Sequence, residues 1–299
     1  MRVVALLCCM CCALTAAAQE RSRTEAPVVS EILATQIALD RAGFSPGEID
    51  GRDGANLQRA RKAYEHAHPE PLTLVGDVPP LIEYTITDAD VAGPFTPDIP
   101  ASLPEQASLD ALNYRNPLEA IAERFHSSPA LLQQLNPDAT FRMAGERIMV
   151  PNVATAPLPG RPADVTVVVS KSTSSLTLED ATGHVLFHAP VTSGSTHDPL
   201  PIGMWKVTGV QRNPTFHYNP ELFWDATPGD RKATLQPGPN NPVGVVWIDL
   251  SKPHYGIHGT PEPSKIGHVE SHGCVRLTNW DANRVAAWVK PGTRVVFRE

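Results

Sequence analysis

The stretch Tyr255-Gly256-Ile257-His258-Gly259-Thr260, followed after a loop by Ser271-His272-Gly273-Cys274-Val275-Arg276-Leu277, is the most informative part of this 299-residue chain. A thiol becomes a strong nucleophile when a neighbouring imidazole takes or shares its proton, because this lowers an ordinary pKa of about 8.5. Two histidines of this stretch, His258 and His272, precede Cys274. Gly273 allows a tight turn in which successive N–H groups can point at a developing oxyanion. These residue types in this order outline an acyl-transfer site.

The same region also contains the residue types of a zinc site. Four histidines and one thiol fall within 21 residues, namely His254, His258, His268, His272 and Cys274. Zn²⁺ accepts nitrogen and sulfur ligands of this kind, but the order H-x3-H, then H-x3-H-x-C, matches none of its usual spacings. We therefore expect no metal ion and no other cofactor. His254 and His268 are expected to be ordinary surface side chains.

The H-G-T and S-H-G-C-V-R sequences resemble the signature of the L,D-transpeptidases, the YkuD family. The resemblance extends beyond the signature and covers residues 164–299. The further blocks that carry it are Thr192–Gly194, Pro201–Gly203, Gln236–Gly244 and Gly292–Val295.

The resemblance also implies roles for individual residues. Cys274 matches the nucleophile and His258 the general base, although the sequence alone leaves His272 open as the proton carrier. His272, Gly273, Ser271 and Gly259 are implied to support the site or the oxyanion, with Ser271 orienting a histidine. Arg276, Tyr255 and Trp224 are implied to bind substrate.

The activity implied by the resemblance is a step of peptidoglycan biosynthesis. The Cys274 thiolate would attack the third residue of a donor stem tetrapeptide, D-Ala would leave, and an amine acceptor would resolve the thioester. The product would be a cross-link between third-position residues, or an envelope lipoprotein attached to peptidoglycan. An L,D-carboxypeptidase or endopeptidase would use the same acyl-enzyme. A non-catalytic wall-binding scaffold is the alternative from another class, and the complete motif speaks against it.

Residues 210–232 form a long segment between the motif blocks, with aromatic and polar side chains. It includes Arg212, His217, Tyr218, Trp224 and Asp225. Such a segment can cover the donor site as a lid or form an ordered surface loop.

Short β-branched runs between turn residues predict a sheet-rich domain over residues 164–299. The expected strands are Asp164–Ser170, Ser175–Glu179, His184–Thr192, Gly203–Gly209, Val243–Leu250, Tyr255–His258 and Arg294–Phe297. One helix is expected from Trp280 to Val289, since Asp281 favours its N-terminus. The resemblance implies a mainly antiparallel β-sandwich or barrel.

Two smaller modules are expected before this domain, so the chain is predicted to be multidomain. Residues 28–67 show helical apolar spacing around a Gly- and Pro-punctuated turn and resemble a peptidoglycan-binding helical module. Residues 84–152 resemble a LysM module, with an opening strand at 84–86, two helices and a closing strand, which implies a glycan-binding or spacer role. A connecting domain without a ligand is the alternative. A Pro-rich linker, 153–163, follows.

The first 18 residues have the charged start, short apolar run and small-residue cleavage site of a secretory signal peptide. We therefore expect a periplasmic protein without a membrane anchor after cleavage. Cleavage would remove four of the five cysteines and leave Cys274 alone. The formal charge is 25 − 32 = −7 with no block of Lys and Arg, which predicts no nucleic-acid partner.

Overall fold

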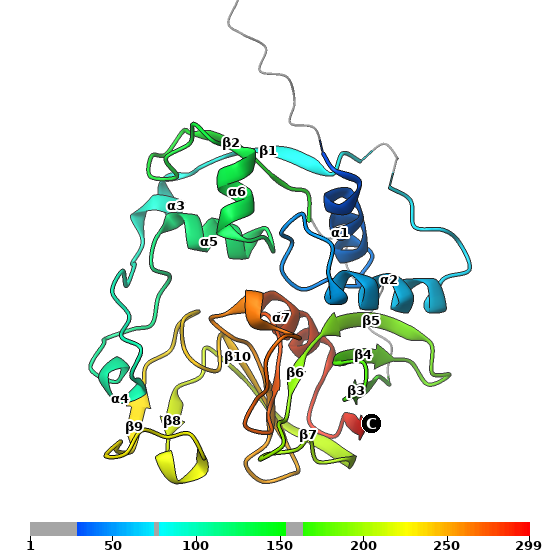
Figure 1. Ribbon diagram of the computed structural model, residues 1–299, viewed down its shortest axis with the longest axis vertical. Coiled ribbons are helices and arrows are strands. Elements are labelled where there is room, and N and C mark those ends of the chain that lie inside the picture. Colours follow the sequence, from blue (N-terminus) through cyan, green and yellow to red (C-terminus); the bar gives the residue numbers. More distant parts are fainter. Residues whose placement is uncertain (1–28, 75–77, 154–163) are drawn as a thin grey trace, which may run out of the picture.

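The computed structural model describes residues 29–74, 78–153 and 164–299. The predicted signal peptide, 1–18, and residues 154–163 of the predicted linker lie outside the described residues. In Figure 1 the C-terminal sheet occupies the lower half, and most of the helices that precede it in the sequence lie above it. Among the described residues, no helix combines the length and the hydrophobicity needed to cross a membrane.

Residues 164–299 form a nine-stranded sheet, which confirms the sheet-rich prediction. Its strands are β3 (Thr166–Ser170), β4 (Ser175–Glu179), β5 (Val185–Pro190), β6 (Thr192–Ser193), β7 (Gly203–Arg212), β10 (Val246–Leu250), β11 (Gly256–His258), β12 (Val275–Arg276) and β13 (Arg294–Arg298). The spatial order is β5-β4-β3-β13-β7-β10-β11-β12-β6. The two edge strands, β5 and β6, are separated only by Val191 in the chain. The sheet must therefore curl until its edges meet, and it forms a nearly closed barrel.

The sheet is mixed, which refines the expectation of a mainly antiparallel one. β3 pairs with β13, and β11 with β12, in parallel. The other neighbouring pairs of this sheet are antiparallel. A parallel pair needs a long crossover connection, and β12 follows β11 only after a loop of more than a dozen residues. The short strand β12, absent from the predicted set, exists only because that loop returns to β11.

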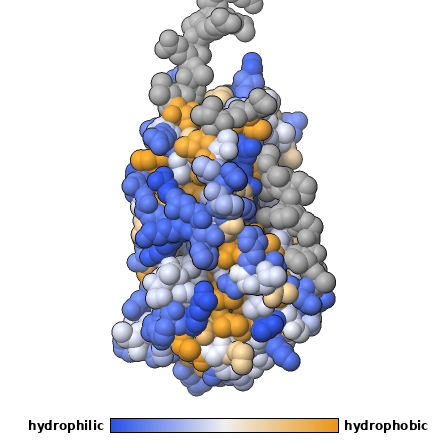
Figure 2. All heavy atoms as spheres, turned by 90° about the vertical axis from the view of Figure 1, so that its right-hand side faces the viewer, coloured by the Kyte–Doolittle hydropathy of each residue, from blue (hydrophilic) through white to orange (hydrophobic). Residues whose placement is uncertain are grey.

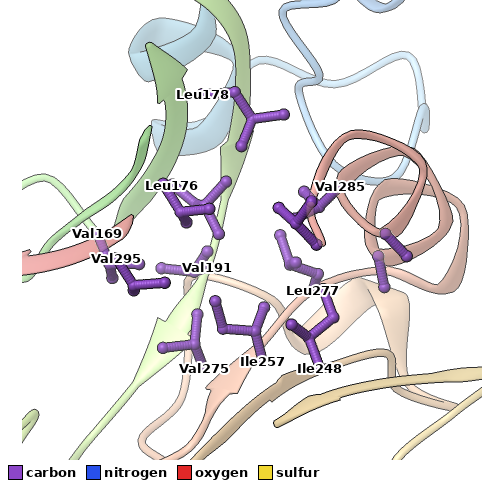
Figure 3. Packing of buried hydrophobic residues seen from close by; sticks show 14 of the residues in the cluster. Val169, Leu176, Leu178, Val191, Ile248, Ile257, Val275, Leu277, Val285 and Val295 are labelled. Atoms are coloured by element: carbon purple, nitrogen blue, oxygen red, sulfur yellow. The ribbon is translucent and has the colours of Figure 1, made fainter. Parts of the chain in front are cut away.

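The core of the barrel is built from alternate residues of these strands and one helix, α7 (Asn279–Trp288). Figure 3 shows Val285 of α7 facing Leu277, with Ile257, Val275 and Ile248 beyond it. Each fully buried Val, Leu or Ile contributes about 1.5–3 kcal/mol. The side chain of Thr278 accepts a hydrogen bond from the Asp281 N–H and caps the start of α7. The observed ends of α7 each differ by one residue from the predicted helix Trp280–Val289, so that prediction is confirmed.

Helices α1 (Glu31–Arg41) and α2 (Ala55–Ala67) confirm the two helices expected on either side of the Gly-rich turn. The turn itself touches the barrel: Ser45 N–H donates to the His188 carbonyl at 2.8 Å, and His188 N–H donates to the Gly43 carbonyl at 3.0 Å. Val185 of β5 packs with Phe44 and Leu57 in one apolar cluster. Figure 2 shows the face that carries this contact, where hydrophobic residues appear as separate patches among hydrophilic ones.

The second N-terminal unit has the order strand, helix, helix, strand. β1 (Leu81–Thr85) pairs antiparallel with β2 (Arg147–Pro151), and α5 (Pro117–Arg124) and α6 (Pro129–Leu135) lie between them in sequence. Their shared core includes Ile121, Leu132 and Ile148. The opening strand starts at Leu81, earlier than the expected 84–86. The Pro-rich stretch also contains two short helices, α3 (Asp88–Ala92) and α4 (Leu103–Gln106).

Residues 93–115, here called the arm, leave this unit and reach the far side of the barrel (Figure 1). There they meet residues 213–235, here called the hairpin segment, which contains β8 (Phe216–Tyr218), the 3-10 helix η1 (Pro220–Leu222) and β9 (Ala233–Leu235). Leu112, Tyr218 and Leu235 form a buried cluster between the two. Leu112 N–H donates to the Pro237 carbonyl at 3.0 Å, and Asn240 N–H donates to the Leu112 carbonyl at 2.9 Å.

A buried ion network fastens both N-terminal units to α7. Arg284 of α7 holds the Asp40 carboxylate through two nitrogens, at 2.9 and 3.0 Å, and the His126 ring nitrogen Nδ1 lies 3.0 Å from the same carboxylate. The His126 ring also stacks on Trp280, with centroids 5.2 Å apart. Burial alone would raise the pKa of Asp40, but Arg284 and His126 together hold it well below its usual range. One carboxylate thus joins three parts of the chain.

Candidate active site

The register of β11 and β12 decides which side chains meet at the thiol. Ile257 pairs with Val275, and both point into the barrel core. Side chains alternate along a strand, so His258 of β11 and Arg276 of β12 lie on the opposite face. Cys274, directly before β12, lies on that face too. The sheet therefore brings the predicted nucleophile, base and arginine to the same side.

These residues line a cavity of about 1070 Å³. The motif residues in its wall are Tyr255, His258, His272, Cys274 and Arg276. The rest of the wall includes residues of the arm and of the hairpin segment. The volume lies at the upper end of the range for small-molecule and peptide sites.

His258 is held as a neutral ring with one free nitrogen. Its Nδ1 donates to the Gly259 carbonyl at 2.7 Å, so Nε2 carries the lone pair. Burial, with a smaller effect of the Arg276 charge, lowers the pKa of His258 to about 3. At neutral pH this ring can accept a proton at Nε2 but does not carry one at rest.

Trp247 supports His258 and was not among the predicted site residues. Its ring stacks on the imidazole with centroids 5.3 Å apart and an interplanar angle of 19°. The same ring lies across Gly256, where an added Cβ would come within 2.5 Å of it. Only the pairing of Trp247 with His258 across β10 and β11 shows this role. No local sequence pattern indicates it.

Cys274 is half-buried and is a free thiol. Burial raises the pKa of Cys274, while the Gly256 N–H and the Arg276 charge lower it and Asp198 raises it further. The net shift is upward, so the resting thiol keeps its proton. This differs from the lowered pKa expected from the sequence, because the desolvation of the sulfur outweighs the nearby cation.

His272 has partners at both ring nitrogens. Its Nε2–H donates to the Asp225 carboxylate of the hairpin segment at 2.7 Å, and its Nδ1 lies 3.5 Å from an Arg276 nitrogen. The Phe223 ring packs edge-on against it at 4.8 Å. Both nitrogens of His272 are therefore engaged, whereas His258 Nε2 has no hydrogen-bond partner among the described residues.

Ser271 and Gly273 shape the loop that carries the thiol. The Ser271 hydroxyl donates to the Cys274 carbonyl at 2.7 Å and accepts from the Gly194 N–H at 2.7 Å. The expectation that Ser271 orients a histidine is therefore wrong, because its hydroxyl is used by backbone groups. Gly273 has φ +95°, and an added Cβ would lie 2.7 Å from the Tyr255 ring. The tight turn expected at Gly273 is confirmed.

The remaining predicted residues fall at different places. Tyr255 lines the cavity and covers Gly273. Gly259 leaves room for the Asn279 side chain, whose oxygen accepts from the Val245 N–H at 3.2 Å. Trp224 is 56% exposed and stacks on His197 with centroids 4.4 Å apart, and its neighbours Phe223 and Asp225 line the cavity.

The predicted segment 210–232 divides into two parts. Arg212 belongs to β7 and its guanidinium donates to the Asn283 side chain at 2.9 Å. His217, Tyr218, Phe223 and Asp225 line the cavity. The segment is thus an ordered wall of the cavity from residue 214 onward.

His254 and His268 are exposed, as expected, although the His254 carbonyl lies 3.8 Å from the Cys274 sulfur. Within residues 29–74, 78–153 and 164–299, no three His, Cys, Asp or Glu side chains are arranged to hold a metal ion.

Comparison with known proteins covers the C-terminal part of the chain. The family profile described as "L,D-transpeptidase catalytic domain" (YkuD) matches residues 164–297. A protein named "Putative L,D-transpeptidase YkuD" of Bacillus subtilis is 32% identical over 182 residues, which are 60% of this chain and 92% of the relative. "Putative L,D-transpeptidase YqjB" of the same organism is 31% identical over 151 residues, covering 48% and 74%.

Two solved structures align with lower identity. An L,D-transpeptidase from Mycobacterium smegmatis aligns with a TM-score of 0.38 and 18% identity, over 52% of this chain and 64% of that one. L,D-transpeptidase 1 of Mycobacterium tuberculosis aligns with a TM-score of 0.33 and 18% identity, over 44% and 60%. The chain therefore spans less than two thirds of either solved protein.

Proposed function

The chain belongs to the YkuD family of L,D-transpeptidases, and from this premise we propose that it transfers the acyl group of a peptidoglycan stem peptide through a thioester on Cys274. The observation that carries the proposal is the shared sheet face of β11 and β12, which holds His258 with a free Nε2 and the Cys274 thiol in one cavity. A neutral base beside a protonated thiol is the resting state that acyl transfer starts from.

In the first half-reaction, the Cys274 sulfur attacks the carbonyl carbon of the third residue of a donor tetrapeptide. His258 Nε2 takes the thiol proton as the S–C bond forms, and the carbonyl oxygen becomes an oxyanion. Backbone N–H groups around residues 272–274 are the donors proposed for this oxyanion. When the C–N bond breaks, the imidazolium returns the proton to the departing D-Ala amine, leaving a thioester.

Proton transfer must accompany attack because neither group ionises at rest. The pKa of Cys274 is raised and that of His258 is lowered, so the uncharged pair dominates at neutral pH. The Arg276 cation lies on the same sheet face and stabilises the sulfur anion as it develops. The half-buried Arg276 side chain lines the cavity, where its charge can also attract an anionic group of the substrate.

In the second half-reaction, an amine attacks the thioester, His258 accepts its proton, and the thiol is regenerated. A stem-peptide amine as acceptor gives a cross-link between third-position residues, and a lysine of an envelope lipoprotein gives an attached protein. Water in place of the amine gives an L,D-carboxypeptidase or endopeptidase. Product analysis distinguishes these acceptors.

The N-terminal units are proposed to hold the enzyme on its polymer. The strand-helix-helix-strand order of β1, α5, α6 and β2 supports a LysM-like glycan-binding module over residues 84–152. The α1–turn–α2 unit supports a peptidoglycan-binding-like module over 28–67. A cleaved signal peptide and a periplasmic location complete the proposal. Binding of residues 19–299 with Cys274→Ala to purified sacculi tests the tethering role.

The chemistry is tested by intact-mass spectrometry after incubation with a carbapenem, an acylating probe. We expect one adduct in the wild-type protein, none in Cys274→Ala and a much slower adduct in His258→Ala. Purified muropeptides then report the product. Full cross-linking by Cys274→Ala would overturn the proposal, whereas adduct formation followed only by hydrolysis would assign the carboxypeptidase activity.

A further inference from the structure

The cavity around Cys274 is completed by residues that precede residues 164–297, the part of the chain that the family profile matches. Ile99, Leu103, Gln106 and Arg115 of the arm line the same cavity as Cys274. The family profile itself matches only from residue 164 onward. A substrate bound at the Cys274 thiol can therefore also contact the arm.

The arm is fixed firmly enough to act as a wall. Leu112 is fully buried against Tyr218 and Leu235, and its N–H and C=O groups bond Pro237 and Asn240 at 3.0 and 2.9 Å. Gly238 has φ +148°, and a Cβ there would overlap the Leu112 carbonyl. This close approach of two backbones holds the arm against the loop that follows β9.

The wall has an apolar part and one cation. Ile99 and Leu103 pack in the same cluster as Phe216 and Phe223 of the hairpin segment. Arg115 is exposed. Among the described residues its guanidinium contacts two side chains, the Asn240 oxygen at 3.3 Å and the Glu119 carboxylate at 3.5 Å, and both contacts are made by Nη1. Its other N–H donors remain free for a ligand.

The distribution of charges around the cavity determines where a ligand carboxylate can bind. The other charged side chains in the wall are Asp198, Asp225, Asp230, Glu262 and Arg276. The acidic groups disfavour a ligand carboxylate in their vicinity. Arg276, two positions after Cys274, lies beside the reacting thiol. Arg115, from a different segment, is the cation placed to take a carboxylate that is not at the reacting carbonyl.

We propose that the arm is the substrate-selecting wall of this active site, and that Arg115 pairs with a carboxylate that the donor peptide carries away from the reacting carbonyl. This inference rests on the proposed acyl transfer at Cys274. Arg115 acts as a binding residue, and the apolar arm surface receives the aliphatic part of the same peptide.

The test uses Arg115→Gln in the full-length protein, with donor peptides whose remote carboxylate is either free or amidated. Loss of a charge-assisted hydrogen bond in an exposed site predicts a rise in KM of about tenfold for the free-carboxylate peptide, with kcat unchanged. The amidated peptide should bind wild type and variant alike. Arg294→Gln is the matched control, because Arg294 is an exposed arginine on β13 that does not line the cavity.

A second readout separates this inference from the proposed function. A carbapenem should acylate Cys274 in Arg115→Gln at the wild-type rate, since the carboxylate of this small probe lies next to the reacting amide and not at a distance where Arg115 would bind it. Equal KM values for both peptides in Arg115→Gln and wild type, with acylation intact, would overturn the role of the arm and leave the acyl transfer standing. Failure of the wild-type protein to form any adduct would overturn the proposed function itself.

Discussion

His258 is a residue whose chemistry is set by its surroundings rather than by its type. The imidazole is buried, stacked on Trp247 and hydrogen-bonded at Nδ1, so the charged form is strongly disfavoured. The thiol of Cys274 is shifted in the opposite sense. Both shifts keep the pair uncharged until a substrate carbonyl arrives.

We expect His258 to stay neutral through the physiological range and to take up a proton only near pH 3. An unfolded histidine protonates near pH 6.5, so the unfolded state binds the extra proton first. The contribution of His258 to stability is therefore complete above about pH 6.5 and is lost as the pH falls from there towards 3. An NMR titration of the histidine rings measures this directly.

The variant His258→Gln identifies the NMR resonance of His258, because that resonance is missing from its spectrum. It is also the control for the stability measurement. Wild type should lose stability relative to His258→Gln as the pH is lowered from 6.5 to 4, measured by urea unfolding. Comparison with this variant cancels the contribution of His188 to the pH dependence of stability. Burial lowers the pKa of His188 to about 4, so its contribution has the same sign in both proteins. A His258 resonance that titrates near pH 6.5 would contradict the arrangement described for the site.

At the scale of elements, the arm and the hairpin segment depend on each other. Neither segment has enough regular structure to be stable by itself. The arm contains only the short helix α4, and β8 and β9 of the hairpin segment form a two-stranded ribbon, whose stability in isolation is marginal. Their stability comes from the cluster around Leu112 and from the two backbone bonds that Leu112 makes. Asp225, which holds His272, belongs to the same segment.

Leu112→Ala should therefore destabilise the protein by about 2–5 kcal/mol, because it removes a fully buried side chain and leaves a cavity. Hydrogen exchange should accelerate at the amides of Leu112 and Asn240, whose bonds join the arm to the barrel. Leu222→Ala is the control, since Leu222 is 53% exposed in the hairpin segment. Equal effects of the two variants on urea unfolding would show that the arm is not held by this cluster.

For the whole molecule, the Asp40 network decides how the N-terminal units sit on the barrel. Arg284→Met would leave the Asp40 carboxylate buried without its main partner, and such a loss costs about 3–5 kcal/mol. Loss of the Arg284 charge raises the pKa of Asp40 from its lowered position, and it raises further the pKa of the buried Asp281 carboxyl, which Arg284 also contacts at 3.5 Å. The variant should therefore lose stability as the pH rises, so its deficit against wild type widens from pH 4 to pH 8.

Urea unfolding at several pH values measures this deficit. Arg294→Met is the control, because Arg294 is exposed on β13. The double variant Asp40→Asn, Arg284→Met should recover part of the lost stability by removing the unpaired charge. A deficit for Arg284→Met no larger than that for Arg294→Met, or one independent of pH, would contradict the role given to the network.

The sequence by itself determined the elements and the reacting residue types. Short β-branched runs between turn residues predicted β3, β4 and β13 within two residues at each end, and the acidic Asp281 near its start predicted α7, because these patterns are local. The H-G-T and S-H-G-C-V-R motifs marked His258 and Cys274 for the same reason. These signals depend only on neighbours within a few positions of the chain.

Only the tertiary structure decided what depends on distant contacts. Trp247 reaches His258 through strand pairing, and Leu112 reaches Pro237 from 125 positions away (237 − 112). The raised pKa of Cys274 and the lowered pKa of His258 result from burial by many segments together. Ser271 bonds backbone instead of a histidine because the loop folds back on Gly194. Desolvation and long-range pairing are properties of the packed molecule, and no short stretch of sequence records them.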